Sequence, residues 1–333
     1  MKTVAVVGYG YWGPNILRVL VQNNLANVKY LCDLNKSKLE IVSQKFPDIK
    51  TTREYNDVLK DPSVDAVFII TPINTHYNLA KEALLHNKDA FVEKPITGSV
   101  ETTEKLISLA KEKGKILMVG HTFEFSPPVI ETDRIIKSGE LGNIYFITSS
   151  RVNLGIHRKD ISVIWDLAPH DFSMIFSWLG EQPNEILTLG RDSIIKGNLD
   201  VAFMNLRFPS GVIANVEVSW LSPVKMRRTV IVGSKKMLVY DDTENVEKVK
   251  IFDRGVDIEN PENFGEYQLT YRSGTIVSPK LKNTEPLKNE LMHFIECITE
   301  RKTPKTDGHS ALRVIKAIEA AEKSSEVCSY VKL

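Results

Sequence analysis

The sequence predicts an α/β protein, in which a doubly wound parallel sheet of the Rossmann type precedes an α+β domain with a large, open and mainly antiparallel sheet. The chain opens with an apolar run, Val4–Val7, that enters a turn rich in glycine. Apolar runs and amphipathic segments then alternate as far as Gly120, which indicates repeated strand–helix units. Beyond that glycine, short apolar strands follow one another with turn residues between them, as in antiparallel sheets. We therefore expect two domains, at 1–121 and 122–333.

The composition is that of an ordinary globular protein. The length of 333 residues fits two domains of roughly 100–200 residues each. A formal net charge of +1 gives no reason to expect nucleic acid or an anionic membrane as a partner. No apolar run approaches the roughly 20 residues of a membrane helix, and we expect no leader peptide before the first strand. The three cysteines lack metal-ligand spacing, so we expect a cytoplasmic protein with reduced thiols and no metal site.

Each element of the first domain has its own signal. Continuous apolar runs predict buried parallel strands at Val4–Val7, Val28–Asp33, Lys50–Thr52, Val64–Ile70, Ala90–Val92 and Ile116–Val119. Apolar residues at helical spacing predict helices that begin at Pro14 and lie at Lys36–Phe46, Tyr55–Leu59, Asn74–Leu85 and Ser99–Lys113.

The second domain mixes helices with consecutive strands. We expect helices at Pro127–Ser138, Trp165–Leu179, Glu285–Ile298 and Ser310–Lys323. We expect strands of an antiparallel meander at Ile144–Val152, Ile186–Leu189, Val201–Phe208, Val212–Trp220, Arg228–Val232 and Met237–Tyr240. Asp253–Ser278 is polar with few periodic apolar residues, which favours a loop that is mobile or contacts a partner. Helices on one face leave the other face of the sheet to be covered, which predicts a homodimer or homotetramer through that sheet.

The turn after the first strand predicts a dinucleotide site. Gly8, Gly10 and Gly13 have G-x-G-x-x-G spacing between a strand and a helix. The first glycine allows a tight turn, the second lets the backbone approach a pyrophosphate, and the third lets the helix pack close to the strand. Asp33 stands at the end of the second strand, where a carboxylate binds ribose hydroxyls and disfavours a 2′-phosphate. We therefore expect NAD as the cofactor.

Polar residues also end the other strands of this domain. Since ligands bind at the carboxyl ends of parallel strands, we expect Thr71-Pro72, Glu93-Lys94 and His121 to gather at one site. The residues expected to bind the cofactor are Gly8, Tyr9, Gly10, Tyr11, Trp12, Gly13, Asp33, Leu34, Thr71, Pro72, Asn74, His76, Glu93 and Lys94. Two alternatives stay open here: Trp12 could simply pack, and Asn74 and His76 could cap a helix.

Four motifs in this order and spacing resemble the Gfo/Idh/MocA (glucose–fructose oxidoreductase/inositol dehydrogenase) family of nicotinamide-dependent sugar dehydrogenases. They are Gly8-Tyr9-Gly10-Tyr11-Trp12-Gly13, Thr71-Pro72 with His76, Glu93-Lys94-Pro95, and Asp166-Leu167-Ala168-Pro169-His170. The resemblance covers nearly the whole chain and implies that Lys94, Asp166 and His170 form the catalytic group. Arg151–Gly155 and Trp165–Asp171 look most similar to the branch that acts on sugar nucleotides, such as UDP-N-acetylglucosamine 3-dehydrogenase. After Gly120 the chain departs from the family's usual Phe-Asn-Arg-Arg-Phe, with His121-Thr122-Phe123-Glu124-Phe125 in its place.

The oxidation of a hydroxyl group needs these same residue types. A base must take the hydroxyl proton as hydride leaves the carbon, and histidine suits that role near neutral pH. Asp166 and His170 stand four residues apart, so on one helix they share a face, and the carboxylate can orient substrate hydroxyls or the imidazole. Lys94 can stabilise the negative charge that develops on the reacting oxygen. Taken singly, a solvated helix face and a strand-end lysine would explain these residues equally well.

We therefore expect an NAD-dependent oxidoreductase acting on a CH–OH group. In the leading interpretation it oxidises the 3-hydroxyl of a pyranose, a UDP-N-acetylhexosamine, with His170 as base. The expected substrate-binding residues are Lys94, His121, Arg151, Asn153, Asp166 and His170. The cations that could neutralise a diphosphate are Arg151, Arg158, Lys159, Lys225, Arg227 and Arg228; for Arg151, pairing on its own strand is the alternative. An inositol or free-sugar dehydrogenase, or an NAD-dependent glycosidase using transient C3 oxidation, remains an alternative function.

Overall fold

The computed structural model describes residues 1–259 and 268–333. By its internal contacts the chain divides into two compact units. The first unit comprises Met1–Ser126 and Thr284–Lys316, and the second comprises Pro127–Asn283 and Ala317–Leu333. A late segment of the chain thus packs with the N-terminal part.

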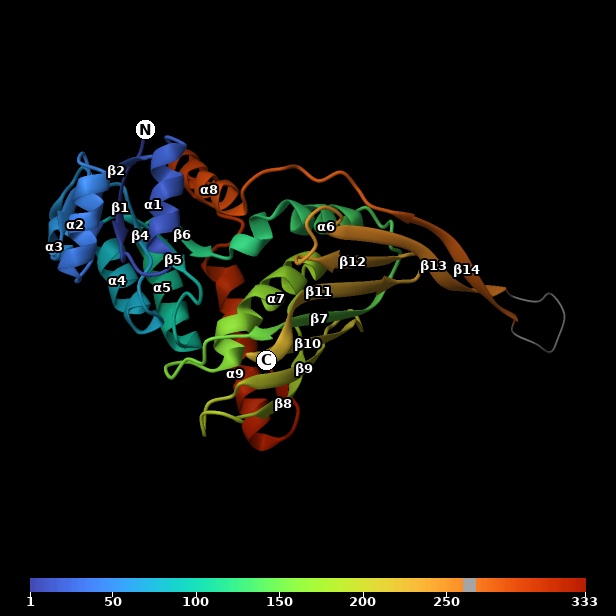
Figure 1. The fold of residues 1–333 in the computed structure, drawn as a ribbon. Coiled ribbons are helices and arrows are strands. Elements are labelled where there is room, and N and C mark those ends of the chain that lie inside the picture. The colour runs from blue at the N-terminus through green and yellow to red at the C-terminus, as the bar shows by residue number, and fades with distance from the viewer. Residues whose placement is uncertain (260–267) are drawn as a thin grey trace. The chain divides into compact units, whose positions relative to one another are not determined.

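In the first unit a parallel sheet has the strand order β3-β2-β1-β4-β5-β6, as the predicted doubly wound fold requires (Figure 1). Its strands are β1 (Thr3–Val7), β2 (Asn27–Cys32), β3 (Lys50–Thr52), β4 (Ala66–Ile69), β5 (Asp89–Glu93) and β6 (Leu117–Gly120). Its helices are α1 (Gly13–Gln22), α2 (Lys36–Lys45), α3 (Tyr55–Lys60), α4 (Ile73–Leu85), α5 (Val100–Glu112), the 3-10 helix η1 (Thr122–Phe125) and α8 (Pro286–Glu300). Helix α9 (Gly308–Val327) begins in this unit. The strands and helices predicted up to residue 121 are all present, with ends shifted by a few residues.

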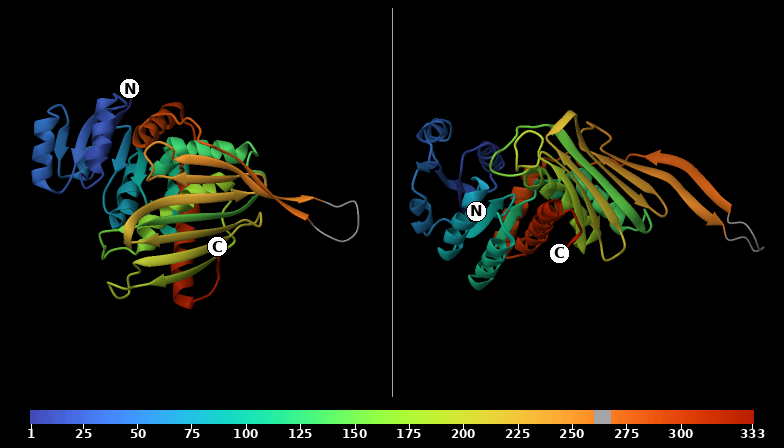
Figure 2. Two further views of the ribbon diagram at one scale, coloured as in Figure 1. Left: turned by 45° about the vertical axis from the view of Figure 1, so that its right-hand side comes forward. Right: turned by 90° about the horizontal axis from the view of Figure 1, so that it is seen from below.

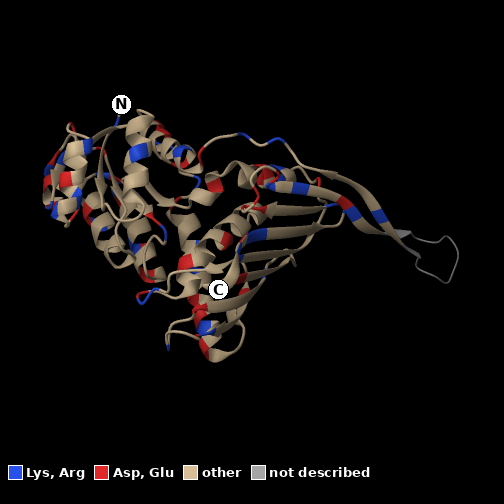
Figure 3. Cartoon of the chain, in the orientation of Figure 1, with Lys and Arg blue, Asp and Glu red and all other residues tan. Residues whose placement is uncertain are grey.

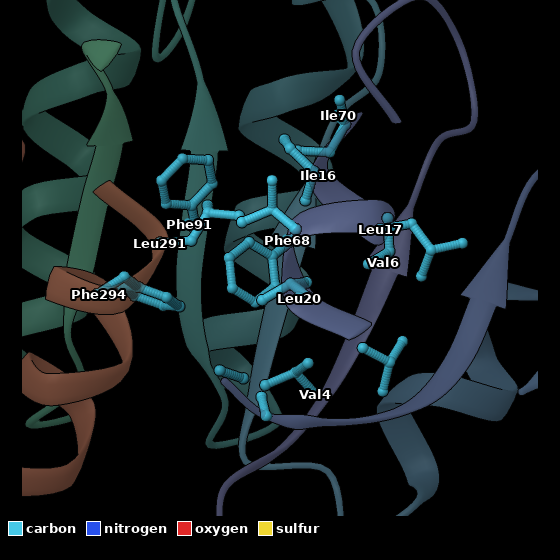
Figure 4. Close-up of a cluster of buried hydrophobic side chains, with 14 of the residues drawn as sticks. Val4, Val6, Ile16, Leu17, Leu20, Phe68, Ile70, Phe91, Leu291 and Phe294 are labelled. Carbon is cyan, nitrogen blue, oxygen red and sulfur yellow. The ribbon is translucent and has the colours of Figure 1, made fainter. Parts of the chain in front are cut away.

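Helices α1 and α8 cover one face of this sheet and form its core (Figure 4). The rings of Phe68, Phe91 and Phe294 meet with centroids 5.2 to 5.6 Å apart. Ile16 and Leu20 of α1 are fully buried beside them. Each such side chain contributes about 1.5–3 kcal/mol by leaving water, so α8 is an integral part of the first unit.

The second unit is built on a nine-stranded mixed sheet in the described part of the chain, with the order β14-β13-β12-β11-β7-β10-β9-β8-β15. The strands are β7 (Ile144–Leu154), β8 (Glu185–Arg191), β9 (Val201–Arg207), β10 (Ile213–Ser219), β11 (Leu221–Gly233), β12 (Met237–Asp241), β13 (Val249–Glu259), β14 (Gln268–Val277) and β15 (Val331–Lys332). Most neighbours are antiparallel, as predicted. The simple meander is wrong, however, because β7 lies between β10 and β11 and pairs with β10 in parallel.

The prediction of a loop at 253–278 is also wrong. Strands β13 and β14 occupy most of that segment and pair with each other, while 260–267 lie outside the described residues. Asp253 and Arg272 form an ion pair across the two strands, with Nε 2.9 Å from Oδ1. A two-stranded ribbon held by its own backbone hydrogen bonds needs no buried face, so the apolar alternation on which the prediction depended is missing there.

Among the described residues, helices cover one face of this sheet (Figure 2). Helix α7 (Val163–Leu179) packs on β7, β9 and β10, and α6 (Pro127–Lys137) packs on β12 and α7. Alternate residues of β9 and β10 are therefore buried, while apolar residues of the opposite face are exposed, among them Phe146, Leu189, Phe203 and Ile213.

Charged residues of both signs are interspersed along the elements of each unit (Figure 3). Within the described residues no helix is long and apolar enough to cross a lipid bilayer.

Candidate active site

The glycine turn has the geometry that a dinucleotide requires. Gly8 has a φ of +98°, and a Cβ at this position would lie 2.3 Å from the carbonyl oxygen of Ile70. A Cβ on Gly13 would lie 2.5 Å from the carbonyl oxygen of Gly8. At Gly10, by contrast, no atom of the described residues comes within 4 Å of a built Cβ. The turn itself therefore requires glycine at positions 8 and 13. Gly10 leaves open space where a ligand can approach.

Helix α1 begins at this turn without a cap. Trp12 occupies the N-cap position and makes no capping hydrogen bond with its side chain, and the first turn holds no acidic residue. Pro14 has no N–H, and the N–H groups of Asn15 and Ile16 donate to the carbonyl oxygen of Trp12 at 2.9 and 3.1 Å. What this end of the helix offers an anion is therefore the positive end of the helix dipole. Tyr11 and Trp12 are exposed beside it, with ring centroids 5.9 Å apart. These residues fit the pyrophosphate of a dinucleotide.

Asp33 closes the glycine turn as well as standing at the end of β2. Its Oδ2 accepts the backbone N–H of Tyr9 at 2.6 Å, and its Oδ1 accepts that of Asn35 at 2.8 Å. Two cations that the sequence did not single out lie nearby. The Nζ of Lys38 is 4.0 Å from Oδ2, and Arg53 donates its Nε–H to the carbonyl oxygen of Leu34 at 3.1 Å.

His76 is buried, with only 1% of its surface exposed. Its Nδ1 lies 2.8 Å from the carbonyl oxygen of Pro95 and its Nε2 lies 2.7 Å from that of Thr71. Burial lowers the pKa of this imidazole, although hydrogen bonds to the two carbonyls oppose that effect. The ring thus ties the end of β4 to the Glu93-Lys94-Pro95 turn, and we assign it a positioning role toward the cofactor. Asn74 is exposed and makes no cap: Pro72 is the N-cap residue of α4, without a side-chain hydrogen bond.

Glu93 and Lys94 end β5, and the Lys94–Pro95 peptide bond is cis. The Glu93 side chain is buried, whereas Lys94 is half-buried. The Glu93 carboxyl group lies 3.2 to 3.3 Å from the position of a Cβ on Gly120, so a side chain at the end of β6 would require this carboxyl group to shift by a few tenths of an ångström. Its Oε2 accepts the backbone N–H of Lys94 at 3.1 Å. Burial raises the pKa of Glu93 to about 7, against the opposing effect of the Lys94 ammonium.

His121 follows β6 and is 2% exposed. Neither of its ring nitrogens has a hydrogen-bond partner among the described residues. Burial, together with the nearby Lys94 ammonium, lowers its pKa to about 3, so the ring is neutral. A neutral imidazole can both donate and accept a hydrogen bond, which keeps the expected contact with substrate open as a proposal.

Helix α7 carries Asp166 in its first turn and His170 one turn later. The indole N–H of Trp220, at the start of β11, donates to Asp166 Oδ2 at 3.2 Å. On the other side, Arg158 Nη1 lies 3.9 Å from Asp166 Oδ1. The carboxylate is thus held in place from two elements, and the i,i+4 spacing puts His170 on the same helix face. Nothing in the sequence singled out Trp220, because no local pattern links it to α7.

Arg151, one of the expected substrate-binding residues, pairs with Asp171 of helix α7. Its side chain is buried, with the residue 4% exposed, and its Nε donates to Asp171 Oδ2 at 2.6 Å. Ser149 donates its hydroxyl to Asp171 Oδ1 at 2.8 Å. The buried pair therefore anchors α7 on β7, and contact of Arg151 with substrate stays a prediction. The partner, Asp171, lies on α7, so the structure does not show the alternative of pairing along β7.

Among the other phosphate candidates, Arg158 and Arg227 are also paired. Arg158 Nη2 lies 2.7 Å from Asp160 Oδ2, and Arg227 Nη1 lies 3.3 Å from Asp242 Oδ2. Lys159, Lys225 and Arg228 are exposed. Asn153 is half-buried at the end of β7, with its amide nitrogen 3.1 Å from the position of a Cβ on Gly155.

Comparison with known proteins identifies both parts of the chain. A model of the oxidoreductase family with an NAD-binding Rossmann fold, GFO_IDH_MocA, matches residues 2–121. The model of the C-terminal alpha/beta domain of the same family matches residues 134–333.

Curated relatives and solved structures agree with this match. The scyllo-inositol 2-dehydrogenase (NAD(+)) of Bacillus subtilis (strain 168) is 26% identical over 90% of this chain and 87% of its own. The 2,7-anhydro-N-acetylneuraminate hydratase of Escherichia coli (strain K12) is 26% identical over 75% of this chain and 70% of its own. The solved structure of UDP-N-acetylglucosamine 3-dehydrogenase from Acidithiobacillus ferrooxidans has the same fold, with a TM-score of 0.82, 22% identity, and coverage of 98% of each chain.

Proposed function

Because this chain belongs to the Gfo/Idh/MocA family of oxidoreductases with an NAD-binding Rossmann domain, we propose that it oxidises a secondary hydroxyl of a pyranose ring, the 3-hydroxyl in the leading case. The observation that carries this proposal is the face of α7 on which Asp166 and His170 lie one turn apart. An aspartate held by Trp220 and Arg158 has a fixed orientation, which a group that must orient a hydroxyl needs.

The three catalytic residues have distinct roles in the proposal. His170 takes the hydroxyl proton, and Asp166 orients the substrate and favours the imidazolium that forms. Lys94 is assigned to stabilise the negative charge that develops on that oxygen. The bound nicotinamide supplies the acceptor for the hydride. Glu93 and His76 act on Lys94 indirectly, since one accepts its backbone N–H and the other holds the carbonyl of Pro95.

For the cofactor we propose NAD in preference to NADP. A carboxylate at the end of β2, such as that of Asp33, disfavours a 2′-phosphate on the adenosine ribose because like charges repel. Arg53 and Lys38 are the cations that could offset this repulsion. Dissociation constants for both dinucleotides test the proposal. Equal or tighter NADP binding that is lost in Arg53→Ala would contradict it.

For the substrate we propose a sugar nucleotide, such as a UDP-N-acetylhexosamine. The similarity to UDP-N-acetylglucosamine 3-dehydrogenase supports this, as does the exposure of Lys159, Lys225 and Arg228. One observation favours a second candidate, an inositol or an unphosphorylated sugar. Arg151, Arg158 and Arg227 already have carboxylate partners within the second unit, so their charge is largely balanced.

A screen of cofactor reduction with UDP-N-acetylglucosamine, N-acetylglucosamine and myo-inositol at matched concentrations distinguishes these substrates. Net reduced cofactor with the sugar nucleotide alone supports the proposal, and comparable turnover of an unphosphorylated ring removes the nucleotide from it. Product analysis adds a further class, because one relative is named a hydratase. A changed sugar without net reduced cofactor would indicate transient oxidation, as in the NAD-dependent glycosidases.

Variants then test the assigned residues. His170→Ala and Lys94→Ala should each slow turnover by about 10²–10⁴-fold while the dinucleotide still binds. The matched control is His309→Ala, which removes an exposed histidine at the start of α9 and should leave turnover unchanged. Near-normal turnover in either catalytic variant would overturn its role.

A further inference from the structure

Behind Lys94 the first unit buries two carboxyl groups to which the proposed reaction assigns no proton transfer. Glu93 is 8% exposed at the end of β5, and Glu290 on α8 is 0% exposed. Glu93 packs on Gly120 and accepts the backbone N–H of Lys94, so its carboxyl group is fixed beside a catalytic residue. Carboxyl groups are rarely buried without a countercharge, which makes this pair a candidate for a function.

The groups around the pair come from three other elements. Thr122 of η1 donates its hydroxyl to Glu290 Oε2 at 2.7 Å, while Glu290 Oε1 has no hydrogen-bond partner among the described residues. Glu124, also on η1, faces Glu290 but is balanced by Lys305, whose Nζ lies 3.6 Å from its carboxylate. His121, after β6, faces Lys94 and is neutral.

These surroundings affect the pKa values of the two carboxyl groups differently. Burial, followed by the charges of Glu93 and Glu124, raises the pKa of Glu290 well above its ordinary value, which favours the neutral acid. Glu93 is buried as well, but the Lys94 ammonium and backbone N–H offset part of the effect, and its pKa rises only to about 7. Glu93 is thus the member of the pair that a modest change of nearby charge can ionise or neutralise.

We propose that Glu93 changes its protonation with the redox state of the bound nicotinamide, so that it is a carboxylate beside the oxidised ring and a neutral acid beside the reduced one. The inference rests on the proposed function, because it needs a nicotinamide next to the oxygen that Lys94 contacts. An oxidised nicotinamide carries a positive charge and a reduced one carries none. Two unit charges within about 10 Å in protein interact strongly enough to change an affinity by roughly tenfold.

The protons and electrons balance in this scheme. The hydride of the substrate carbon goes to the nicotinamide, and the hydroxyl proton goes to His170. Glu93 takes up one proton from solvent as the positive charge beside it disappears. Exchange of reduced for oxidised cofactor returns that proton to solvent.

Binding of the two dinucleotides as a function of pH tests the proposal without any substrate. Dissociation constants of NAD⁺ and NADH are measured by calorimetry between about pH 5.5 and 8.5, a range centred on the pKa of Glu93 near 7. We expect NAD⁺ to bind roughly tenfold more tightly at the high end, because Glu93 is then anionic, and NADH to change little. The ratio of the two constants cancels pH effects on groups that contact only the shared adenosine diphosphate.

Two variants test whether Glu93 is the group that causes the pH dependence of NAD⁺ binding. In Glu93→Gln the pH dependence of NAD⁺ binding should vanish and NAD⁺ affinity should stay at its low-pH value, with NADH binding unchanged. Glu290→Gln is the matched control, because burial already favours the neutral acid at this position, and the pH dependence should remain. Thermal melts establish that both variants fold; if Glu93→Gln does not, the comparison of NAD⁺ with NADH in the wild type decides.

Three results would overturn the inference and leave the proposed function standing. They are parallel pH profiles for NAD⁺ and NADH, a profile retained in Glu93→Gln, and a profile lost in Glu290→Gln. If neither dinucleotide binds at any pH, the proposed function fails together with the inference.

Discussion

Replacement of Arg151 by Met is expected to destabilise the second unit by about 3–5 kcal/mol. The guanidinium is buried and bonds both oxygens of Asp171, with Nε at 2.6 Å and Nη2 at 3.3 Å. Methionine keeps an unbranched chain of similar length but removes the charge, so that the Asp171 carboxylate is left without its cation. Breaking a buried ion pair by removing one partner costs about 3–5 kcal/mol, because an uncompensated charge stays in the interior. At roughly 2–4 °C per kcal/mol for a domain of this size, the melting temperature should fall by about 6–20 °C.

Unfolding in urea or on heating, followed by tryptophan fluorescence, measures this loss. Three of the four tryptophans, Trp165, Trp178 and Trp220, lie in the second unit and report on it. Arg158→Met is the matched control, because its pair with Asp160 is partly exposed. It should cost less than about 1 kcal/mol, as partly exposed ion pairs generally do.

The double variant Arg151→Met/Asp171→Leu separates charge from packing. With both charges removed, most of the lost stability should return, because apolar residues of similar volume replace buried ion pairs with little penalty. A single variant within about 1 kcal/mol of the wild type would refute the assigned role of the pair. A double variant no more stable than the single one would attribute the loss to packing instead.

Three further predictions follow from single positions. Gly8→Ala should abolish dinucleotide binding in calorimetry, because its Cβ would lie 2.3 Å from the carbonyl oxygen of Ile70; unchanged affinity would contradict the proposed cofactor turn. The pKa of His121 falls from 6.5 to about 3 on folding, so the unfolded chain binds the proton first and the free energy of unfolding decreases as pH falls from 6.5 toward 3. In His121→Phe this decrease, measured by urea unfolding, should be smaller than in the wild type. Ile213→Lys puts a charge on the exposed apolar sheet face and should convert an oligomer to a monomer in light scattering, whereas a monomeric wild type would refute the predicted sheet-face assembly.

The first unit was predicted well because its signals are local. A strand buried on both faces is a continuous apolar run, as in Ala66–Ile69, and the glycines after β1 mark the turn by their own conformation. No local signal in the sequence indicates that α8 packs on the sheet of the first unit. The sequence shows an amphipathic helix, but which sheet Phe294 covers depends on how the chain returns from the second unit.

The second unit was predicted less well because strand order is not a local property. The register of β7 between β10 and β11 is set by pairs far apart in sequence, such as Val152 with Ser219 and Met226. Val249 and Ile251 of β13 are buried, but none of the described side chains at 252–256 and 270–277 is, so apolar alternation does not reveal the rest of the β13–β14 ribbon. In both cases the missing information is long-range pairing, not the strand propensity of a segment.

At the site, the sequence indicated residue types but not their partners. Asp33 was predicted to face a ribose, and its bond to the Tyr9 N–H shows that it also holds the glycine turn. His76 was predicted near the cofactor with a cap as the alternative, and the structure adds that it joins two strand ends through both ring nitrogens. Glu290 was not predicted at all, because a glutamate on an amphipathic helix normally faces solvent.

Each of the two motifs that we propose to be catalytic pairs a reactive residue with an adjacent residue whose side chain is buried. Lys94 is half-buried, while its neighbour Glu93 turns inward onto Gly120. His170 is half-buried, while its neighbour Asp171 turns inward onto Arg151. Consecutive residues at a strand end or on a helix point in different directions, so one position can meet substrate while the next is fixed in the core. A dipeptide of two charged residues is therefore the shortest sequence that both presents a reactive group and holds its backbone in place.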